Sequence, residues 1–478
     1  MRLAIIGAGI SGLSAAYRFN QICPTCGIDI FDRRSRIGGL LETLCQDGYE
    51  IEQSADNFIT TIPWGIQLCK ELGLTDKLVQ TNSAFRRTYV VRNGKLHLLP
   101  DGFLMMAPTK LYPMATTPIL SIFGKIRAGL ELFIPARKDN NDESMADFVR
   151  RRLGREVFER LVEPLVSGVY AADMEKLSLM ATLPRFREME RDHGSLIRAM
   201  QKQLAANRSA NLAEQSGARY SMFVTIKGGL SVICNTIAEK LPTNSIKLGQ
   251  NITAIKKTNN NKWILTSNAN KIDSHNPHTP NNTTTEYDAV ILSCQAHDAA
   301  ELITEELPEI SQRLAKIEHE GTAIATFAFN SNQIKQNIKG MGFVVPKIEN
   351  SAILAGSFSS LKYPHRAPEG KQLIRIFAGG ARMPNAATMN DNELVPLLLG
   401  ELRRVVEIVG EPLLAVVSHW ARTMPQYHIG HRDLINEIET LSKNEPNFAL
   451  AGNAFHGIGI PNCIRSGFDA AEKISQVS

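Results

Sequence analysis

The N-terminal stretch Leu3-Ala-Ile-Ile-Gly-Ala-Gly-Ile-Ser-Gly12 decides the fold of this chain. A short apolar run leads into G-x-G-x-x-G and then into an Ala-rich segment. Gly7 permits a tight turn, Gly9 lets the backbone approach a pyrophosphate, and Gly12 lets a helix pack closely on its strand. The free N–H groups at the start of that helix then face phosphates. The pattern predicts a strand–turn–helix unit that binds a dinucleotide through Gly7, Gly9, Ile10, Ser11 and Gly12.

A second apolar run, Ile28-Asp-Ile-Phe31, ends in the acid Asp32. It follows Gly12 by about twenty residues, which suits a carboxylate that accepts hydrogen bonds from an adenosine ribose. Such an acid disfavours NADP because it repels a 2′-phosphate, although Arg33 and Arg34 follow directly and leave a phosphate contact open. Asp32 and Arg33 are therefore the predicted contacts at the adenosine end.

Two further glycine turns favour FAD over a nicotinamide cofactor. The turn Arg36-Ile-Gly38-Gly39 supplies a second close-approach loop beside the pyrophosphate. Near the C-terminus a buried strand over 448–451 leads into a glycine-rich turn and a helix over 463–474. The N-terminus of that helix can face the flavin edge where negative charge develops on reduction. The predicted FAD contacts are Arg36, Gly38, Gly39, Gly452, Asn453, Gly459 and Ile460, with Ile252 from a strand over 252–255.

Composition places the chain among ordinary globular proteins. Its 478 residues exceed what one core usually supports, so two or three domains are expected. A net charge of +5 is too mild to indicate a nucleic-acid partner, and no apolar run reaches the ~18 residues that span a bilayer. The seven scattered cysteines are typical of reduced thiols in a cytosolic protein. Cys23-Pro-Thr-Cys26 is interpreted as a turn rather than a redox or zinc site, and no metal or Ser/His/Asp constellation is evident.

Between the dinucleotide-binding segments the pattern is first helical and then strand-rich. The segment 103–135 is apolar and Pro-punctuated, which suits helices that dip into a membrane interface or a buried helical layer. Ser144 and Asp147 predict a helix start, and Arg150-Arg-Arg152 in that helix is interpreted as a solvated face, with membrane contact as the alternative. Period-2 strands between 322 and 420 predict a mostly antiparallel sheet, a platform for a flat substrate.

The chain resembles the oxygen-dependent porphyrinogen oxidases, that is, the protoporphyrinogen oxidases and their coproporphyrinogen III-oxidising members within the flavin amine oxidase-like superfamily. The similarity extends over the whole chain. Beyond the glycine fingerprint it rests on the segment 160–172, Phe358-Ser-Ser360, Arg366-Ala-Pro368, Gly379-Gly380, Met424-Pro-Gln-Tyr427, Gly430-His431, Ala451-Gly-Asn453 and the segment 457–464.

The resemblance implies an α/β fold. A discontinuous Rossmann-like FAD-binding domain is expected together with a mixed or antiparallel substrate sheet and a helical region that docks on a membrane. The expected FAD-binding parts are 1–85, 211–300 and 431–478. The expected substrate parts are 86–100 and 301–430, and the helical part is 101–210. The implied location is the cytoplasm, with a peripheral position on the inner membrane face and a homodimer as further options.

The implied chemistry is oxidation of a porphyrinogen by FAD and O2 in heme biosynthesis, with no general base assigned. In the family an arginine just before the hairpin over 88–98 anchors a substrate propionate. Arg87 matches it if the hairpin carries one extra residue, and Arg86 is the fallback. One departure concerns the stretch Glu52-Gln-Ser-Ala-Asp56, which stands where the family has Gly-Pro, so the loop over the reactive face of the flavin is expected to differ.

Three other functions remain as alternatives. An amine oxidase would want aromatic residues beside the flavin, which Asn453-Ala-Phe455 fits poorly. A carotenoid-desaturase-like enzyme would need an apolar tunnel without carboxylate anchors. A non-enzymatic FAD scaffold would bind FAD that no porphyrinogen reduces.

Overall fold

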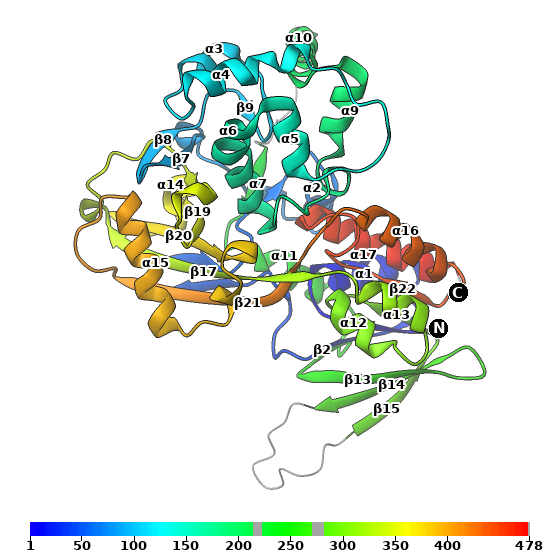
Figure 1. Cartoon of the computed structure of the whole chain (residues 1–478). Coiled ribbons are helices and arrows are strands. Elements are labelled where there is room, and N and C mark those ends of the chain that lie inside the picture. Colours follow the sequence, from blue (N-terminus) through cyan, green and yellow to red (C-terminus); the bar gives the residue numbers. More distant parts are fainter. Residues whose placement is uncertain (214–221, 270–281, 477–478) are drawn as a thin grey trace.

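The computed structural model describes residues 1–213, 222–269 and 282–476. Its first layer is a five-stranded parallel sheet in the order β12-β2-β1-β16-β22, built from three distant parts of the chain (Figure 1). The strands β1 and β16 are apolar and largely buried because helices or strands cover both faces of the sheet. They are β1 (Arg2–Ile6), β2 (Gly27–Asp32), β12 (Ile246–Leu248), β16 (Ala289–Leu292) and β22 (Phe448–Leu450).

Helices pack against one face of this sheet, where Leu13, Ile233 and Ile464 are fully buried in a shared core. The three are α1 (Ile10–Ile22), α11 (Ser231–Glu239) and α17 (Ile460–Ser475). The other face packs against a small antiparallel sheet and three helices, with Trp263 fully buried between them. These elements are β13 (Gln250–Lys257), β14 (Trp263–Ala269), β15 (Asn282–Tyr287), α12 (Ala296–Leu302), α13 (Pro308–Leu314) and α16 (His431–Ser442). The stretch 267–286, whose Asn/Thr/Pro/His-rich composition predicts a solvated hairpin, includes the end of β14 and most of β15, and residues 270–281 lie outside the described residues.

The second sheet has seven strands in the order β21-β17-β20-β19-β18-β7-β8, and all its pairs are antiparallel except β18 with β7. The predicted mostly antiparallel sheet is therefore confirmed, and so is the α/β class with a parallel sheet assembled from discontinuous segments. The strands are β7 (Thr88–Arg92), β8 (Lys95–Leu98), β17 (His319–Asn330), β18 (Gly342–Val344), β19 (Ile353–Phe358), β20 (Lys371–Gly379) and β21 (Leu414–Pro425). Helix α15 (Asp391–Val405) covers one face.

A helical layer stands over the second sheet (Figure 1). Val90 and Val344 of the sheet share its core with Phe148 and Leu161 of the helices. Its main helices are α3 (Leu111–Thr116), α4 (Ile122–Gly129), α5 (Met145–Leu153), α6 (Arg155–Val157), α7 (Glu163–Tyr170), α8 (Leu179–Thr182), α9 (Pro184–His193) and α10 (Leu196–Ala213). A π-helical turn, η4 (Phe158–Val162), precedes α7.

Shorter elements connect the layers. Two small sheets are formed by segments that connect strands of the main sheets. One has three strands in the order β5-β11-β6, and the other is the hairpin β3-β4. Their strands are β3 (Thr43–Gln46), β4 (Tyr49–Glu52), β5 (Phe58–Ile59), β6 (Leu78–Gln80) and β11 (Phe223–Ile226). Helix α2 (Trp64–Glu71) lies between β5 and β6 in the chain.

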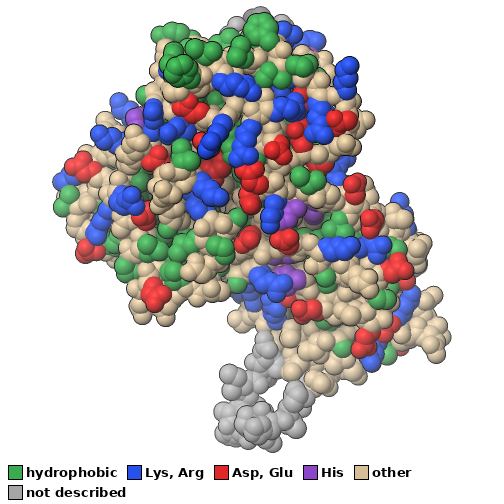
Figure 2. All heavy atoms as spheres, viewed as in Figure 1, with side chains coloured by type: hydrophobic (Ala, Val, Ile, Leu, Met, Phe, Trp, Pro, Cys, Tyr) green, Lys and Arg blue, Asp and Glu red, His purple; other side chains and the backbone are tan. Residues whose placement is uncertain are grey.

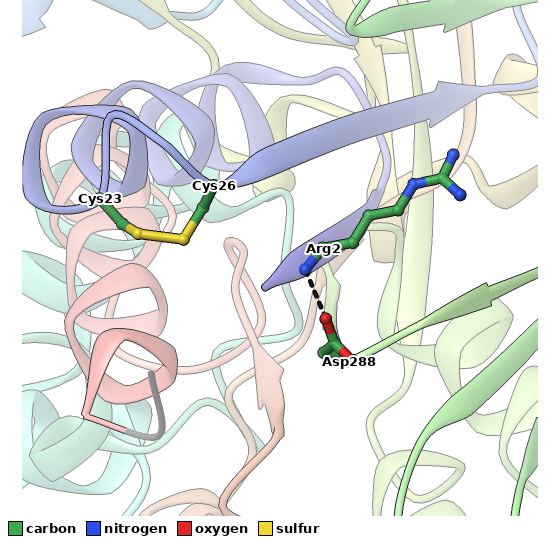
Figure 3. The surroundings of a disulfide bond; sticks show 4 residues. All are labelled: Arg2, Cys23, Cys26 and Asp288. Carbon is green, nitrogen blue, oxygen red and sulfur yellow. Dashed lines mark hydrogen bonds between the residues drawn. A yellow bond between two sulfur atoms is a disulfide. The ribbon is translucent and has the colours of Figure 1, made fainter.

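The turn between α1 and β2 corrects the expectation that all cysteines are reduced thiols. Cys23 and Cys26 form a disulfide (Figure 3). The predicted turn is present, and it brings the two Cα atoms to 5.5 Å, which is within the range of disulfide bonds. On the neighbouring strand, the Arg2 amide donates to Asp288 Oδ2 at 2.7 Å and so holds the start of β1 beside β16.

The arginine run on α5 is the second correction, because Arg152 is buried and Arg151 is mostly so, while Arg150 stays partly exposed beside Glu175. Ser144 caps α5 as predicted, accepting a hydrogen bond from the Asp147 amide. The side chain of Arg152 is fully buried, where it pairs with Glu131 and Glu190. Arg151 pairs with Glu190 as well. Buried acids on neighbouring elements therefore hold Arg151 and Arg152 in place. The sequence of the arginine run does not reveal these partners.

Candidate functional site

The first glycine turn joins β1 to α1, and at one of its glycines, Gly9, there is open space beside the backbone. Gly7 has φ +109°, and a Cβ on Gly12 would stand 2.0 Å from the Gly7 carbonyl oxygen, so both positions require glycine. A Cβ on Gly9, by contrast, would meet no atom nearer than Gly39 Cα at 3.9 Å. The backbone at Gly9 therefore borders space rather than protein. Ile10 and Ser11 form the first turn of α1 at this edge.

The second glycine turn lies directly against the first. The Gly38 amide donates to the Ala8 carbonyl at 2.8 Å, and a Cβ on Gly39 would stand 2.9 Å from Gly9 Cα. Arg36 is paired with Glu42 at 2.6 Å. The arginine that secures this turn is Arg34, which sequence reasoning did not assign; its Nη1 donates to the Gly39 carbonyl at 2.9 Å.

The adenosine end is organised by Asp32 at the end of β2. Its two carboxylate oxygens accept hydrogen bonds from the amides of Ala8 and Arg34, each at 2.8 Å. These bonds fix the carboxylate at the mouth of the glycine turn and leave lone pairs for ribose hydroxyls. Arg33 points to the surface and pairs with Asp298 at 3.5 Å. Ile252 is buried in the same core as Phe31, beside the end of β2.

The C-terminal glycine turn completes the arrangement from the other end of the chain. Gly452 has φ +147°, and a Cβ there would meet nothing nearer than 3.9 Å. The Asn453 side chain donates from Nδ2 to the Thr423 carbonyl at 3.1 Å, which orients the turn. Gly459 precedes Ile460, the buried first residue of α17. The start of α17 therefore faces the turn.

The start of α1 packs closely against the middle of α17 in this region. A Cβ on Gly467 of α17 would stand 2.2 Å from the Ser11 carbonyl oxygen of α1. Helix N-termini carry partial positive charge and unpaired amides, which suits a diphosphate at one and an electron-rich ring edge at the other. The open positions at Gly9 and Gly452 provide the space. The residues present therefore fit FAD.

The loop 53–57, which departs from the family pattern, adjoins the second glycine turn. Ser54 Oγ donates to the Leu40 carbonyl at 2.5 Å, just after Gly39. The second sheet holds this loop through its backbone. Arg375 of β20 donates to the Ser54 carbonyl, and Trp420 Nε1 of β21 donates to the Gln53 carbonyl at 2.7 Å. The loop thus links the second glycine turn to the seven-stranded sheet.

A buried charge cluster surrounds Asp56 in this loop. Asp56 accepts from Lys362 Nζ at 3.1 Å, and one guanidinium nitrogen each of Arg366 and Arg375 lies 3.7 Å from its Oδ2. Burial alone would raise the pKa of Asp56, but the three cations hold that pKa well below its usual range. Burial raises the pKa of the neighbouring Glu52. Asp56 is thus the ionised partner of these cations.

Arg87 lies in an open cavity of about 550 Å³ next to β7. Its guanidinium is exposed, whereas the neighbouring Arg86 is committed to Thr81, donating to the hydroxyl at 3.1 Å and to the carbonyl at 3.2 Å. The segment that carries both connects to the loop above, because the Asn82 amide donates to the Lys362 carbonyl at 3.0 Å. The structure brings the glycine turns, Asp32 and loop 53–57 together, and it places Arg87 in a separate cavity next to β7.

Comparison with known proteins shows what this arrangement resembles. The model of the family described as flavin containing amine oxidoreductase matches residues 10–475. Coproporphyrinogen III oxidase of Bacillus subtilis is 34% identical over 470 residues, covering 97% of this chain and 96% of that protein. The coproporphyrinogen III oxidase of Staphylococcus aureus is 31% identical, covering 99% and 98%. Protoporphyrinogen oxidase 2 of Arabidopsis thaliana is 27% identical, covering 99% and 93%.

Solved structures give the same picture. A crystal structure from Exiguobacterium sp. 255-15, provisionally named a protoporphyrinogen oxidase, has a TM-score of 0.85 at 28% identity, covering 100% of this chain and 99% of that one. A putrescine oxidase has a TM-score of 0.68 at 15% identity, covering 100% and 99%, which shows the shared fold alone.

Proposed function

The chain belongs to the flavin-containing amine oxidoreductase family, and we propose that it oxidises a porphyrinogen to the porphyrin with FAD and O2 in heme biosynthesis. The observation that carries the proposal is the full-length similarity to relatives named coproporphyrinogen III oxidase and protoporphyrinogen oxidase. The relatives of the first name reach 34% and 31% identity, against 27% for the second. Coproporphyrinogen III is therefore the substrate we propose.

The residues of the site have distinct tasks in this reaction. FAD, when bound, supplies the hydride acceptor, and O2 takes up the electrons. Gly7, Gly9 and Gly12 place the start of α1 at the diphosphate, and Asp32 accepts hydrogen bonds from the ribose. The start of α17 stabilises negative charge at the flavin edge. Loop 53–57 and the substrate sheet are held together by Arg375 and Trp420. Arg87 anchors a substrate carboxylate.

A membrane-facing surface is the second part of the proposal. Eight large apolar side chains between 104 and 133 are exposed, among them Tyr112 at 78%, Phe123 at 80% and Phe133 at 77%. They gather over α3 and α4 at the top of the molecule in Figure 2. Apolar patches of this kind typically mark interaction surfaces, and here Lys125 and Arg127 lie on the same helix. Among the described residues, no helix combines the length and apolar character needed to cross a membrane.

The test of the reaction is growth of porphyrin fluorescence with coproporphyrinogen III and protoporphyrinogen IX side by side, with hydrogen peroxide measured in parallel. We expect oxidation of both, faster with coproporphyrinogen III, and a matched loss of both products in an FAD-free preparation. Oxidation of an amine or desaturation of a carotene precursor in the absence of porphyrin formation would replace the proposal with one of those activities. FAD that no porphyrinogen reduces would indicate a scaffold.

A further inference from the structure

The cavity that holds Arg87 has three basic residues and no acid among its described lining residues. Its described lining includes Arg86, Arg87 and Lys339 together with Asn337. At about 550 Å³ it has the size of a small-molecule site, and it opens to solvent. A cavity with three cations and no carboxylate attracts an anionic ligand.

The backbone holds Lys339 beside Arg87 although the two are distant in sequence. The Met341 amide donates to the Arg87 carbonyl at 2.9 Å, which continues the pairing of β18 with β7. The Lys339 amide donates to the Tyr89 hydroxyl at 2.7 Å. A Cβ on Gly340 would stand 2.7 Å from the Arg87 carbonyl oxygen, so the loop can lie this close only because residue 340 is glycine. The position of Lys339 is thus built into the sheet edge.

Two of the three cations, Arg87 and Lys339, have side chains with no polar partner among the described residues. Across the described ranges, neither the Arg87 guanidinium nor the Lys339 ammonium takes part in a hydrogen bond or an ion pair. Arg86, by contrast, is held by Thr81. Asp101 lies within electrostatic reach of Arg87, but it is paired with Lys110 at 2.5 Å. The cavity therefore offers two cations to two anionic groups.

Resting on the proposed function, we infer that Lys339 is a second carboxylate-binding residue, and that Arg87 and Lys339 together hold two neighbouring propionates of one porphyrinogen. Coproporphyrinogen III and protoporphyrinogen IX each carry one pair of propionates on facing edges of adjacent pyrroles. Coproporphyrinogen I, in which methyl and propionate alternate around the ring, has no such pair. Isomer III then binds through two cations and isomer I through one.

The experiment compares wild-type protein with Lys339→Gln, Lys339→Arg and the control Lys335→Gln. Lys335 is an exposed lysine of the same loop that does not line the cavity, and its amide donates to the Glu407 carbonyl at 2.9 Å. KM and kcat are measured with coproporphyrinogens III and I. The dissociation constants of the porphyrin products III and I are measured without turnover, by quenching of their fluorescence. The visible flavin spectrum reports an intact fold.

Lys339→Gln is expected to raise KM and the dissociation constant for isomer III about threefold to tenfold, because one charge-assisted bond is lost. Isomer I should change by less than about twofold, so the preference for III shrinks, and kcat should stay near wild type. Lys339→Arg should keep the preference, and Lys335→Gln should be silent.

Equal binding of the two isomers by wild-type protein, or an equal shift of both in Lys339→Gln, would overturn the inference. Failure of the proposed function is a separate outcome, since it is the absence of porphyrin formation by wild-type protein. The product titration reports on Lys339 in either case.

Discussion

The Tyr427 hydroxyl donates a hydrogen bond to the Asn453 carbonyl oxygen at 2.5 Å and accepts one from the Gly457 amide at 2.9 Å. The Tyr427 ring is buried and stacks on His431, with ring centres 4.1 Å apart. A residue that follows β21 thus ties together two parts of the C-terminal glycine turn. The shape of the proposed flavin end depends on a hydroxyl outside that turn.

Tyr427→Phe should therefore loosen FAD binding while the fold persists. The ring and its stacking remain, but the Asn453 carbonyl and the Gly457 amide lose their shared partner, at a cost of about 1–3 kcal/mol. We expect a dissociation constant for FAD raised about tenfold, measured by flavin fluorescence on dilution. Tyr112→Phe, on exposed α3, is the matched control and should leave FAD binding unchanged. Retention of FAD by Tyr427→Phe equal to that of the control would refute the role of the hydroxyl.

Gly9→Val should yield a folded protein without its yellow colour. A Cβ at residue 9 meets no protein atom nearer than Gly39 Cα at 3.9 Å, so the valine side chain enters the space proposed for the diphosphate. Gly12→Ala differs, because its Cβ would stand 2.0 Å from a carbonyl oxygen and the fold itself must give way. Circular dichroism and the visible spectrum together separate the two outcomes. A Gly9→Val protein that retains its full content of bound flavin would show that this turn does not bind FAD.

Stability should fall as the pH drops from about 6.5 to 4, in part because of His431. Burial lowers the pKa of His431 to about 4, against 6.5 when exposed. The unfolded chain then takes up a proton in this window that the folded chain refuses, so acid favours unfolding. Between pH 7 and pH 5, the free energy of unfolding should fall by about 1–2 kcal/mol less in His431→Gln than in wild type, as measured by urea denaturation. His193→Gln, on α9, serves as control, and a pH dependence identical in all three proteins would contradict this account.

Arg87→Ala should raise KM for coproporphyrinogen III about tenfold to a hundredfold, since charge-assisted bonds are worth ~1.5–3 kcal/mol. FAD content should stay normal because Arg87 lies apart from the glycine turns. Turnover at saturation should fall less than kcat/KM. Steady-state fluorescence assays check both values. If KM is unchanged in both Arg87→Ala and Arg86→Ala, neither arginine binds a substrate carboxylate.

The double variant Phe123→Glu with Phe133→Glu should abolish binding to anionic vesicles. Both side chains are exposed within the apolar surface over α4, so the fold should tolerate the change, whereas burial of two carboxylates in lipid is unfavourable. Sedimentation with phosphatidylserine-containing vesicles at low and high salt measures the effect. Val409→Glu, exposed elsewhere, is the control. Wild-type protein that remains wholly in the supernatant would show that α3 and α4 only cover the helical core.

Much of the fold was predictable because its signals are local. The glycines at 7, 9 and 12 define a turn within ten residues, and the hairpin of β7 and β8 follows from Asn93-Gly94, both of which have positive φ. The period-2 pattern placed the antiparallel strands between residues 322 and 420, and β17 to β21 run from His319 to Pro425. The Cys23–Cys26 bond was missed even though the turn was predicted, because residue spacing alone does not show the thiol redox state.

By itself, the sequence determined where the glycine turns lie, since the glycines of each turn are neighbours in the chain. Only the tertiary structure decided how the charged side chains are used. Arg152, in a run that reads as solvated, is buried against Glu131, and Arg375 reaches the Ser54 carbonyl from another sheet. Lys339 joins Arg87 only because β18 pairs with β7. A charge in a sequence shows neither its partner nor its desolvation, and both are set when distant segments pack together.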